Sequence, residues 1–175
     1  ATNSHNTALG YAAGSAVSTG IDNTLLGARA GIALSDADYN TAIGAFALTT
    51  DTLGSKSVAV GSSALFTQNF TSATDTYNTA VGFNAGALVT VGLRNTIIGG
   101  LTGDALTDAD DNTAIGTQAL SADTLGSGST AIGQGALGSQ NFTGATTTYN
   151  TAVGHQAGVG ISTGIQNSIF GANAG

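Results

Sequence analysis

Side chains that could support catalysis are few in this 175-residue chain. It contains no cysteine, and its only histidines are His5 and His155. His155 follows a repeated glycine, and the corresponding positions elsewhere in the chain hold Tyr11 and Phe83, so it is a variable position rather than a general base. A Gly-x-Ser-x-Gly nucleophile elbow with plausible partners is also missing. We therefore expect no enzymatic activity and no cofactor.

Paired carboxylates are the only candidates for metal chemistry. Asp36 and Asp38 lie two residues apart, as do Asp108 and Asp110 in a sister segment. Oxygen-rich loops can hold Ca²⁺, but they need 6–8 oxygen ligands and a defined frame, and neither the EF-hand nor the nonapeptide calcium motif is present. Aspartate is also a common turn residue. We expect turn residues here and treat calcium as a weak alternative, which a calorimetric titration with Ca²⁺ would test.

Aromatic residues gather in two related segments, residues 66–77 and 138–149. Exposed rings of this kind can stack on sugars, whereas rings that fold back would cap a small core inside each loop. The second interpretation is favoured. The residues concerned are Phe66, Phe70, Tyr77, Phe142 and Tyr149.

Composition narrows the remaining classes. Only 7% of the residues are charged, 41% are hydrophobic, and the net charge is -7. An acidic surface does not suit nucleic acid, because phosphate binding needs a basic one. No apolar run approaches the roughly 20 residues that span a bilayer, so we expect no membrane insertion. The chain can still bury a core, although a thin one built from small side chains.

A pentad, Asn-Thr-Ala-(Ile/Val/Leu)-Gly, recurs along the whole chain. Successive closing glycines follow at intervals of 17, 17, 17 and 21, and this series then begins again, which gives a 72-residue super-repeat. The closing glycines, called marker glycines below, are Gly10, Gly27, Gly44, Gly61, Gly82, Gly99, Gly116, Gly133, Gly154 and Gly171.

This period predicts an all-β fold, a parallel β-solenoid (β-roll) with 17-residue and 21-residue coils. Each pentad reads as a short strand that ends in a turn. Seventeen residues are too few for a helix-pair repeat of roughly 33 residues. Residues 1–175 should form a single solenoid domain, with coils stacked about 4.8 Å apart. Because the chain begins and ends within the pattern, we interpret it as an excerpt of a longer fibre. The four extra residues of each long coil should form a loop that protrudes once every four coils.

Alternation along the strand assigns its two faces. We expect the threonines and the large apolar residues of the pentads to face the interior, as an aliphatic ladder. The opposite face would then carry mostly alanine, with Leu25, Ile97 and Ile169 once every four coils. A strand that is apolar on both faces is usually buried on both. We therefore expect Leu25, Ile97 and Ile169 to lie in an interface between copies of this chain, in a symmetric oligomer.

The segment Ser57-Val58-Ala59-Val60-Gly61-Ser62-Ser63-Ala64 resembles the head repeat of trimeric autotransporter adhesins. The Asn-Thr-Ala-Ile-Gly form with 17-residue spacing is even more similar to repeat arrays in bacteriophage tail fibres. The resemblance covers the whole chain. It implies a homotrimeric β-roll that serves as the shaft of an extracellular fibre, on a virion tail or a bacterial cell surface. The implied partners are two further copies, flanking fibre domains and a host surface glycan or protein.

Two other functions remain open. A self-assembling extracellular filament subunit would use end-to-end stacking, and a monomeric solenoid would bind ice or glycans. Ice binding is disfavoured, because we expect the threonine column to face inward and it lacks Thr-x-Thr pairs. A purified protein without thermal hysteresis would dispose of it.

Overall fold

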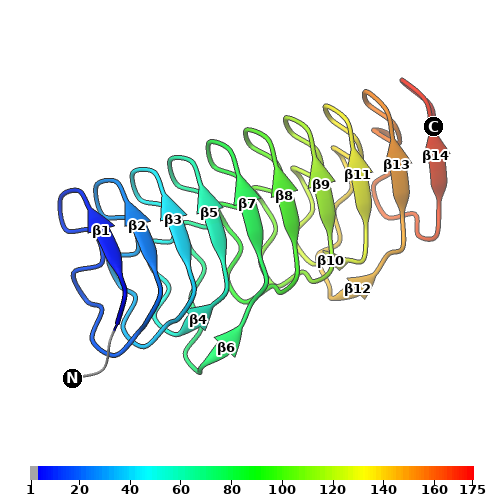
Figure 1. Ribbon diagram of the computed structural model, residues 1–175. Coiled ribbons are helices and arrows are strands. Elements are labelled where there is room, and N and C mark those ends of the chain that lie inside the picture. Colours follow the sequence, from blue (N-terminus) through cyan, green and yellow to red (C-terminus); the bar gives the residue numbers. More distant parts are fainter. Residues whose placement is uncertain (1–3) are drawn as a thin grey trace.

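The structure, a computed structural model, describes residues 4–175 as a parallel β-solenoid of about ten turns, with no helix in that range. Successive coils stack side by side along one axis, from the N-terminal coil in blue to the C-terminal coil in red (Figure 1). The all-β solenoid predicted from the repeat is confirmed.

One ten-stranded parallel sheet runs the length of the solenoid. Each strand pairs in register with the equivalent strand of the next coil, so that Thr7 lies beside Thr24 across a short coil and Val58 lies beside Thr79 across a long one. Every strand coincides with a pentad. The strands are β1 (Thr7–Leu9), β2 (Thr24–Leu26), β3 (Thr41–Ile43), β5 (Val58–Val60), β7 (Thr79–Val81), β8 (Thr96–Ile98), β9 (Thr113–Ile115), β11 (Thr130–Ile132), β13 (Thr151–Val153) and β14 (Ser168–Phe170).

Each long coil forms a separate two-stranded sheet with the coil before it. Strand β4 (Gly54–Ser55) pairs with β6 (Thr74–Asp75), and β10 (Gly126–Ser127) pairs with β12 (Thr146–Thr147). Strands β6 and β12 project beyond the lower edge of the coils in Figure 1. The extra residues therefore form protruding loops, which we call the β6 and β12 loops.

The assignment of the strand faces from sequence was wrong. The central residue of each strand points inward, and the threonine and the large aliphatic residue beside it point outward. Leu25 is 1% exposed and Ile97 is 0% exposed, and Ile169 packs against the same core. These three residues therefore fill the interior and are not available to an oligomer face. The outward residues include Leu9 and Phe170, each 68% exposed.

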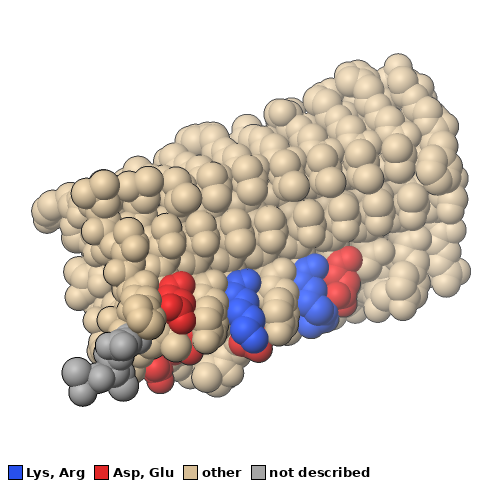
Figure 2. Space-filling view, viewed as in Figure 1, with Lys and Arg blue, Asp and Glu red and all other residues tan. Residues whose placement is uncertain are grey.

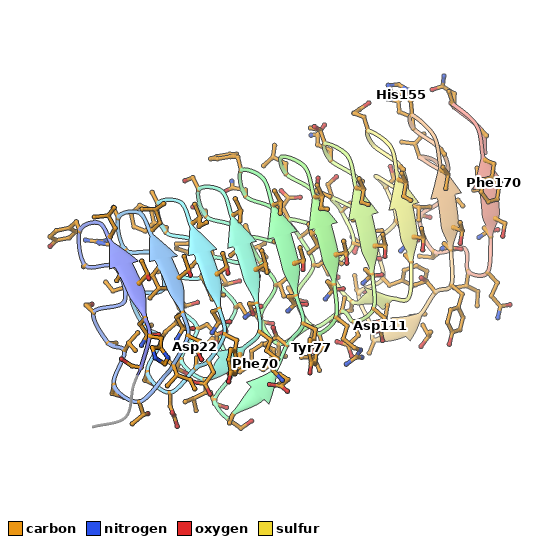
Figure 3. The ribbon with its side chains drawn as sticks, in the orientation of Figure 1. Asp22, Phe70, Tyr77, Asp111, His155 and Phe170 are labelled. Carbon is orange, nitrogen blue, oxygen red and sulfur yellow. The ribbon has the colours of Figure 1, made fainter. Side chains whose placement is uncertain are left out.

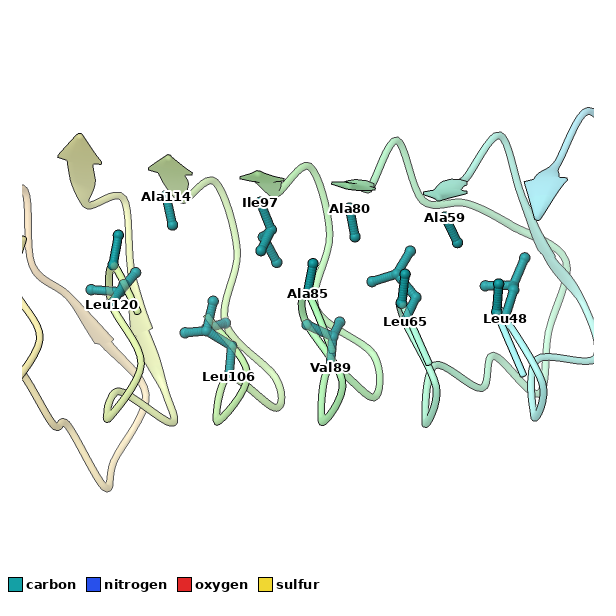
Figure 4. Packing of buried hydrophobic residues seen from close by; sticks show 14 of the residues in the cluster. Leu48, Ala59, Leu65, Ala80, Ala85, Val89, Ile97, Leu106, Ala114 and Leu120 are labelled. Atoms are coloured by element: carbon teal, nitrogen blue, oxygen red, sulfur yellow. The ribbon is translucent and has the colours of Figure 1, made fainter. Parts of the chain in front are cut away.

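Side-chain size explains why the faces are arranged this way. The interior is so thin that the strand centre faces the opposite wall of the coil directly (Figure 4). Opposite the alanine centres Ala59 and Ala114, the wall supplies the leucines Leu65 and Leu120. Where the centre is large, the wall supplies glycine. A Cβ atom on Gly31 would lie 2.8 Å from Cδ2 of Leu25. Large residues on both walls would not fit.

The wall leucines carry a conformational cost. Leu48 has a φ of 51° and Leu65 a φ of 49°, the left-handed backbone that Gly14 and Gly31 adopt at the same position in other coils. A non-glycine residue in this conformation costs about 1–2 kcal/mol. Complete burial of a leucine side chain contributes about 1.5–3 kcal/mol, so burial outweighs the cost of the left-handed backbone. Both leucines are 0% exposed.

Buried asparagines tie each coil to its neighbour. The Oδ1 atom of Asn95 accepts a hydrogen bond of 3.0 Å from the backbone N–H of Asn112 in the next coil. Its Nδ2 atom donates to the carbonyl oxygen of Ala109 at 2.7 Å. Asn23, Asn40 and Asn78 make the same two kinds of bond. This ladder explains the asparagine that opens most pentads.

Candidate functional surface

The outer face of the ten-stranded sheet is the largest regular surface of the molecule. Two columns of side chains cover it, one mostly threonine and the other entirely apolar. Several apolar members are well exposed, with Leu26 at 42% and Ile98 at 37%. The apolar column consists of Leu9, Leu26, Ile43, Val60, Val81, Ile98, Ile115, Ile132, Val153 and Phe170.

Charge is absent from this face. None of the ten strands contains a charged residue. The acidic and basic side chains visible in Figure 2 form a stripe along one side of the sheet, leaving the sheet itself uncharged. A chain with a net charge of -7 thus presents one long surface that is free of electrostatic repulsion.

The charged stripe is held together by ion pairs between coils. Lys56 Nζ lies 2.6 Å from Asp75 Oδ2, and Arg94 Nε lies 2.6 Å from Asp111 Oδ1. Hydrogen bonding to Lys56 lowers the pKa of Asp75, and hydrogen bonding to Arg94 lowers the pKa of Asp111. These pairs are exposed to solvent, and exposed pairs contribute little to stability. They neutralise charges within the stripe and do not form a binding or catalytic site.

The loop aromatics divide into two groups. Phe70 and Phe142 are only 6% and 8% exposed. Phe66 makes an edge-to-face contact with Phe46 at a centroid distance of 6.4 Å. Tyr77 is well exposed, and Lys56 Nζ lies 5.3 Å from its ring centroid. Tyr149 is similarly exposed. Figure 3 shows Phe70 and Tyr77 along the lower side of the solenoid, away from the apolar column.

A buried carboxylate anchors the β6 loop, and the sequence did not lead us to expect it. Asp51 Oδ1 accepts hydrogen bonds of 3.0 Å from the backbone N–H groups of Gly54 and Phe70. Its Oδ2 accepts one of 2.6 Å from Gln68 Nε2, and Gln68 Oε1 accepts one of 2.9 Å from Asn78. All these side-chain bonds are buried, so they hold the loop firmly against the coil.

The β12 loop has the same anchor, made by Asp123, Gly126, Gln140, Phe142 and Asn150. The sequence contains a pattern that predicts this anchor. Asp51 and Gln68 recur as Asp123 and Gln140, 72 residues later, whereas equivalent positions in the other coils are apolar. A polar pair that alternates with an apolar pair at buried positions indicates a hydrogen-bonded network.

No protein-family model, curated protein or solved structure matches the chain. Functional inference therefore rests on the solenoid surfaces themselves.

The carboxylates considered for calcium have structural partners. Asp36 accepts a hydrogen bond from Thr19 at 2.6 Å, and Asp38 accepts one from the backbone N–H of Ile21 at 2.8 Å. Asp110 accepts one from the N–H of Leu93 at 2.8 Å, while Asp108 lies at the surface. Among residues 4–175, no three metal-binding side chains gather at one place. Three of the four candidates thus connect neighbouring coils.

The two histidines lie far apart. His5 Nδ1 is 3.3 Å from Asp22 in the charged stripe of the first coils. His155 is exposed at the turn that follows β13, near the other end (Figure 3). The structure does not bring them together. Within residues 4–175 there is also no pocket and no helix long and apolar enough to cross a membrane.

Asp104 is the one carboxylate at odds with its surroundings. Its Oδ1 atom is buried and has no hydrogen-bond partner in the described part of the chain. Burial raises the pKa of the Asp104 carboxyl, and a weaker opposing effect comes from a hydrogen bond to its own backbone. The folded state therefore binds this proton more tightly than the unfolded chain, so the group opposes folding as pH rises above its ordinary pKa of 3.8.

Replacing this carboxylate should stabilise the protein in a pH-dependent way. We expect Asp104→Asn to raise the urea midpoint at pH 7, with the gain shrinking as pH falls below about 4, because the native carboxyl is then neutral as well. Asp108→Asn, at a carboxylate on the surface, is the control and should show no such gain. Equal effects of Asp104→Asn at pH 3 and pH 7 would exclude ionisation as the cause.

Proposed function

We propose that this chain is a shaft segment of an extracellular fibre in which three copies associate through the outer faces of their ten-stranded sheets. The observation that carries this proposal is the uncharged outer face with its unbroken apolar column. Exposed apolar patches larger than a few hundred Å² usually mark interaction sites. The resemblance to trimeric fibre repeats supports three as the number of copies.

The dimensions of the face set how much contact it supplies. Ten strands about 4.8 Å apart and three residues wide give a surface of about 48 by 10 Å, or roughly 480 Å² per copy. In a trimer each face is shared between two neighbours, so surfaces beside the sheet must add to it before a contact reaches the total of about 1000 Å² that a specific interface buries. A copy of the same chain offers the same column at the same spacing, so the two surfaces match along their whole length.

A mechanical role follows from the way the coils are joined. Backbone hydrogen bonds and the asparagine ladder link each coil to the next, so the solenoid lengthens without a larger core. The anchored β6 and β12 loops lie away from the outer sheet face and would project from the assembled shaft, once every four coils. We propose that such a shaft spaces and stiffens a fibre whose flanking domains contact a host or another surface.

Charges placed in the proposed interface should break the assembly. We expect Ile98→Lys combined with Ile115→Lys to weaken association by about 100-fold or more, because each lysine would have to be desolvated without a partner. Light scattering behind size exclusion would then report a single chain of 16.9 kDa where the parent protein is a multimer. Circular dichroism should be unchanged, since both side chains lie outside the core.

The matched control carries a lysine on the β12 loop. Thr147→Lys replaces an exposed residue away from the sheet face and should leave the mass unchanged. If the double lysine variant keeps the parent's mass, the outer face is not the interface and the fibre-shaft proposal fails in this form.

A second candidate, ice binding, gains from the observed orientation of the threonines. They form an outward column of hydroxyl groups beside the apolar column, in strands paired in register from β1 to β14. A flat, periodic and uncharged surface of this kind can order water. This candidate requires a monomer with a free sheet face. Thermal hysteresis that is lost on Thr96→Lys and Thr113→Lys would favour it over the fibre shaft.

A further inference from the structure

Three large rings stand at one edge of the outer sheet face. Tyr11, Phe83 and His155 each follow a marker glycine directly, two residues after the end of a strand, and they recur with the 72-residue super-repeat. Tyr11 is 74% exposed and Phe83 58% exposed. The same position in the other coils holds residues without rings, namely Ala28, Ala45, Ser62, Gly100, Thr117, Gln134 and Ala172. We call the three ring residues the edge rings.

The backbone that carries the edge rings is fixed. The carbonyl oxygen of Tyr11 accepts a hydrogen bond of 2.8 Å from the backbone N–H of Arg29 in the next coil. The carbonyl oxygens of Phe83 and His155 accept equivalent bonds of 2.9 and 2.8 Å. The rings therefore project from an ordered ladder at a spacing of four coils, about 19 Å.

The apolar face alone does not define how two copies align along the fibre axis. Nearly every coil presents the same kind of outward pair, a threonine with an isoleucine, valine or leucine. A shift of one copy by one coil, about 4.8 Å, would leave those contacts almost unchanged. Uniform surfaces of this type are prone to register slippage unless an additional feature specifies the alignment.

We propose that the edge rings set the axial register between copies of this chain. This inference rests on the proposed self-association. In a cyclic assembly equivalent residues lie at the same height along the axis, so each edge ring would meet the corresponding ring of an adjacent copy. A shift of one coil would replace these ring-to-ring contacts with contacts to residues without rings, such as Ala28, Gly100 and Ala172. Only a partner with the same four-coil spacing fits all the rings at once, and a second copy of the chain has that spacing.

Area and charge also point to a second copy. The sheet face of roughly 480 Å² per copy, shared between two neighbours, supplies less area than a specific interface needs, so the rings beside it add contact where the interface needs it. Tyr11 and Phe83 add no charge to this edge, and the strands next to them carry none either. Two acidic chains can therefore approach along this edge.

A distance measurement between copies would test this role. The chain has no cysteine, so Gly144→Cys offers a unique attachment point for a spin label, and a Cβ atom there meets nothing within 4 Å. Pulsed dipolar spectroscopy on the labelled assembly should give one narrow distance distribution. Ser72→Cys carries the label at the equivalent point of the β6 loop, four coils or about 19 Å away along the axis. In assemblies that mix the two labelled chains, a slip of one coil changes this axial offset by about 4.8 Å. With Tyr11→Ala, Phe83→Ala and His155→Ala in both chains, we therefore expect the distance distribution between the two sites to broaden by a few Å, with the assembly's mass retained.

The matched control removes exposed rings outside the sheet face. Tyr39→Ala with Tyr77→Ala replaces rings that are 52% and 55% exposed and should leave the distribution narrow. An equally narrow distribution for the edge-ring variant would overturn the register role while leaving self-association intact. Loss of assembly in that variant would overturn it too, because the rings would then supply affinity rather than alignment. A parent protein without dipolar coupling would instead refute the self-association.

Discussion

Gly116→Ala should lower the free energy of unfolding by about 3 kcal/mol or more. Gly116 has a φ of 124°, which alanine adopts only with strain. An added Cβ atom would lie 2.6 Å from the carbonyl carbon of Gly133 in the next coil. That atom belongs to the backbone of a hydrogen-bonded strand end, so it cannot move aside without opening the contact between coils. Urea denaturation at fixed protein concentration would measure the loss.

A glycine on the β12 loop provides the control for this substitution. A Cβ atom added to Gly144 would meet nothing within 4 Å, and this residue does not require a left-handed backbone. We expect Gly144→Ala to change stability by no more than about 0.5 kcal/mol. If both alanine variants unfold at the same urea concentration, close stacking of the coils is not the reason that position 116 requires glycine.

The second large effect concerns the core. Ile97→Ala should destabilise the protein by about 2–5 kcal/mol, because it opens a cavity that the surrounding coils cannot fill. Ile97 is fully buried, and the wall positions opposite it are Gly86 and Gly103. A Cβ atom on Gly86 would lie 2.9 Å from Cδ1 of Ile97, so this side chain occupies the space that leucine fills in other coils. Chemical denaturation of the variant gives the value.

The reverse change in a neighbouring coil is the matched test. Ala114→Ile places the same large residue opposite Leu120, where both are already fully packed, and should cost about 1–3 kcal/mol. If the strand-centre residues instead lay in an interface between copies, Ile97→Ala and Ala114→Ile would leave the stability of the single chain unchanged and alter only the assembly.

The period of the sequence was enough to predict the fold. A pentad of β-branched residues closed by glycine, recurring at 17-residue or 21-residue intervals, predicted the strand positions and the parallel stacking, because few other architectures repeat over so short a length. The protruding loops followed from the four extra residues. Loop packing was also predicted in part, since Phe70 and Phe142 fold back and are nearly buried.

The faces were assigned wrongly because large apolar residues were assumed to fill the interior. In this solenoid the interior is too thin for a column of isoleucines, and alanine occupies it instead. The sequence contains the information needed to avoid the error. Leu25 lies opposite Gly14 and Gly31, whereas Ala42 and Ala59 lie in the coils that carry Leu48 and Leu65. Two columns whose sizes compensate in this way must face each other across a core.

Other features could not be derived from the pattern alone. The buried bonds of Asp51 depend on the path of the long coil, which brings Phe70 back beside it. The left-handed backbone of Leu48 and Leu65 is set by the stacking of the coils, against the intrinsic preference of leucine. In both cases tertiary packing overrides a local tendency, and single residues give no indication of it.

The most direct test of the proposed fibre shaft is the solution mass of the unsubstituted chain, measured by sedimentation equilibrium over a range of concentrations. We predict a mass three times the 16.9 kDa of one chain, with the apolar column buried between copies. A folded protein that sediments as 16.9 kDa at every concentration would contradict this account, and the outer sheet face would then be free for another ligand such as ice.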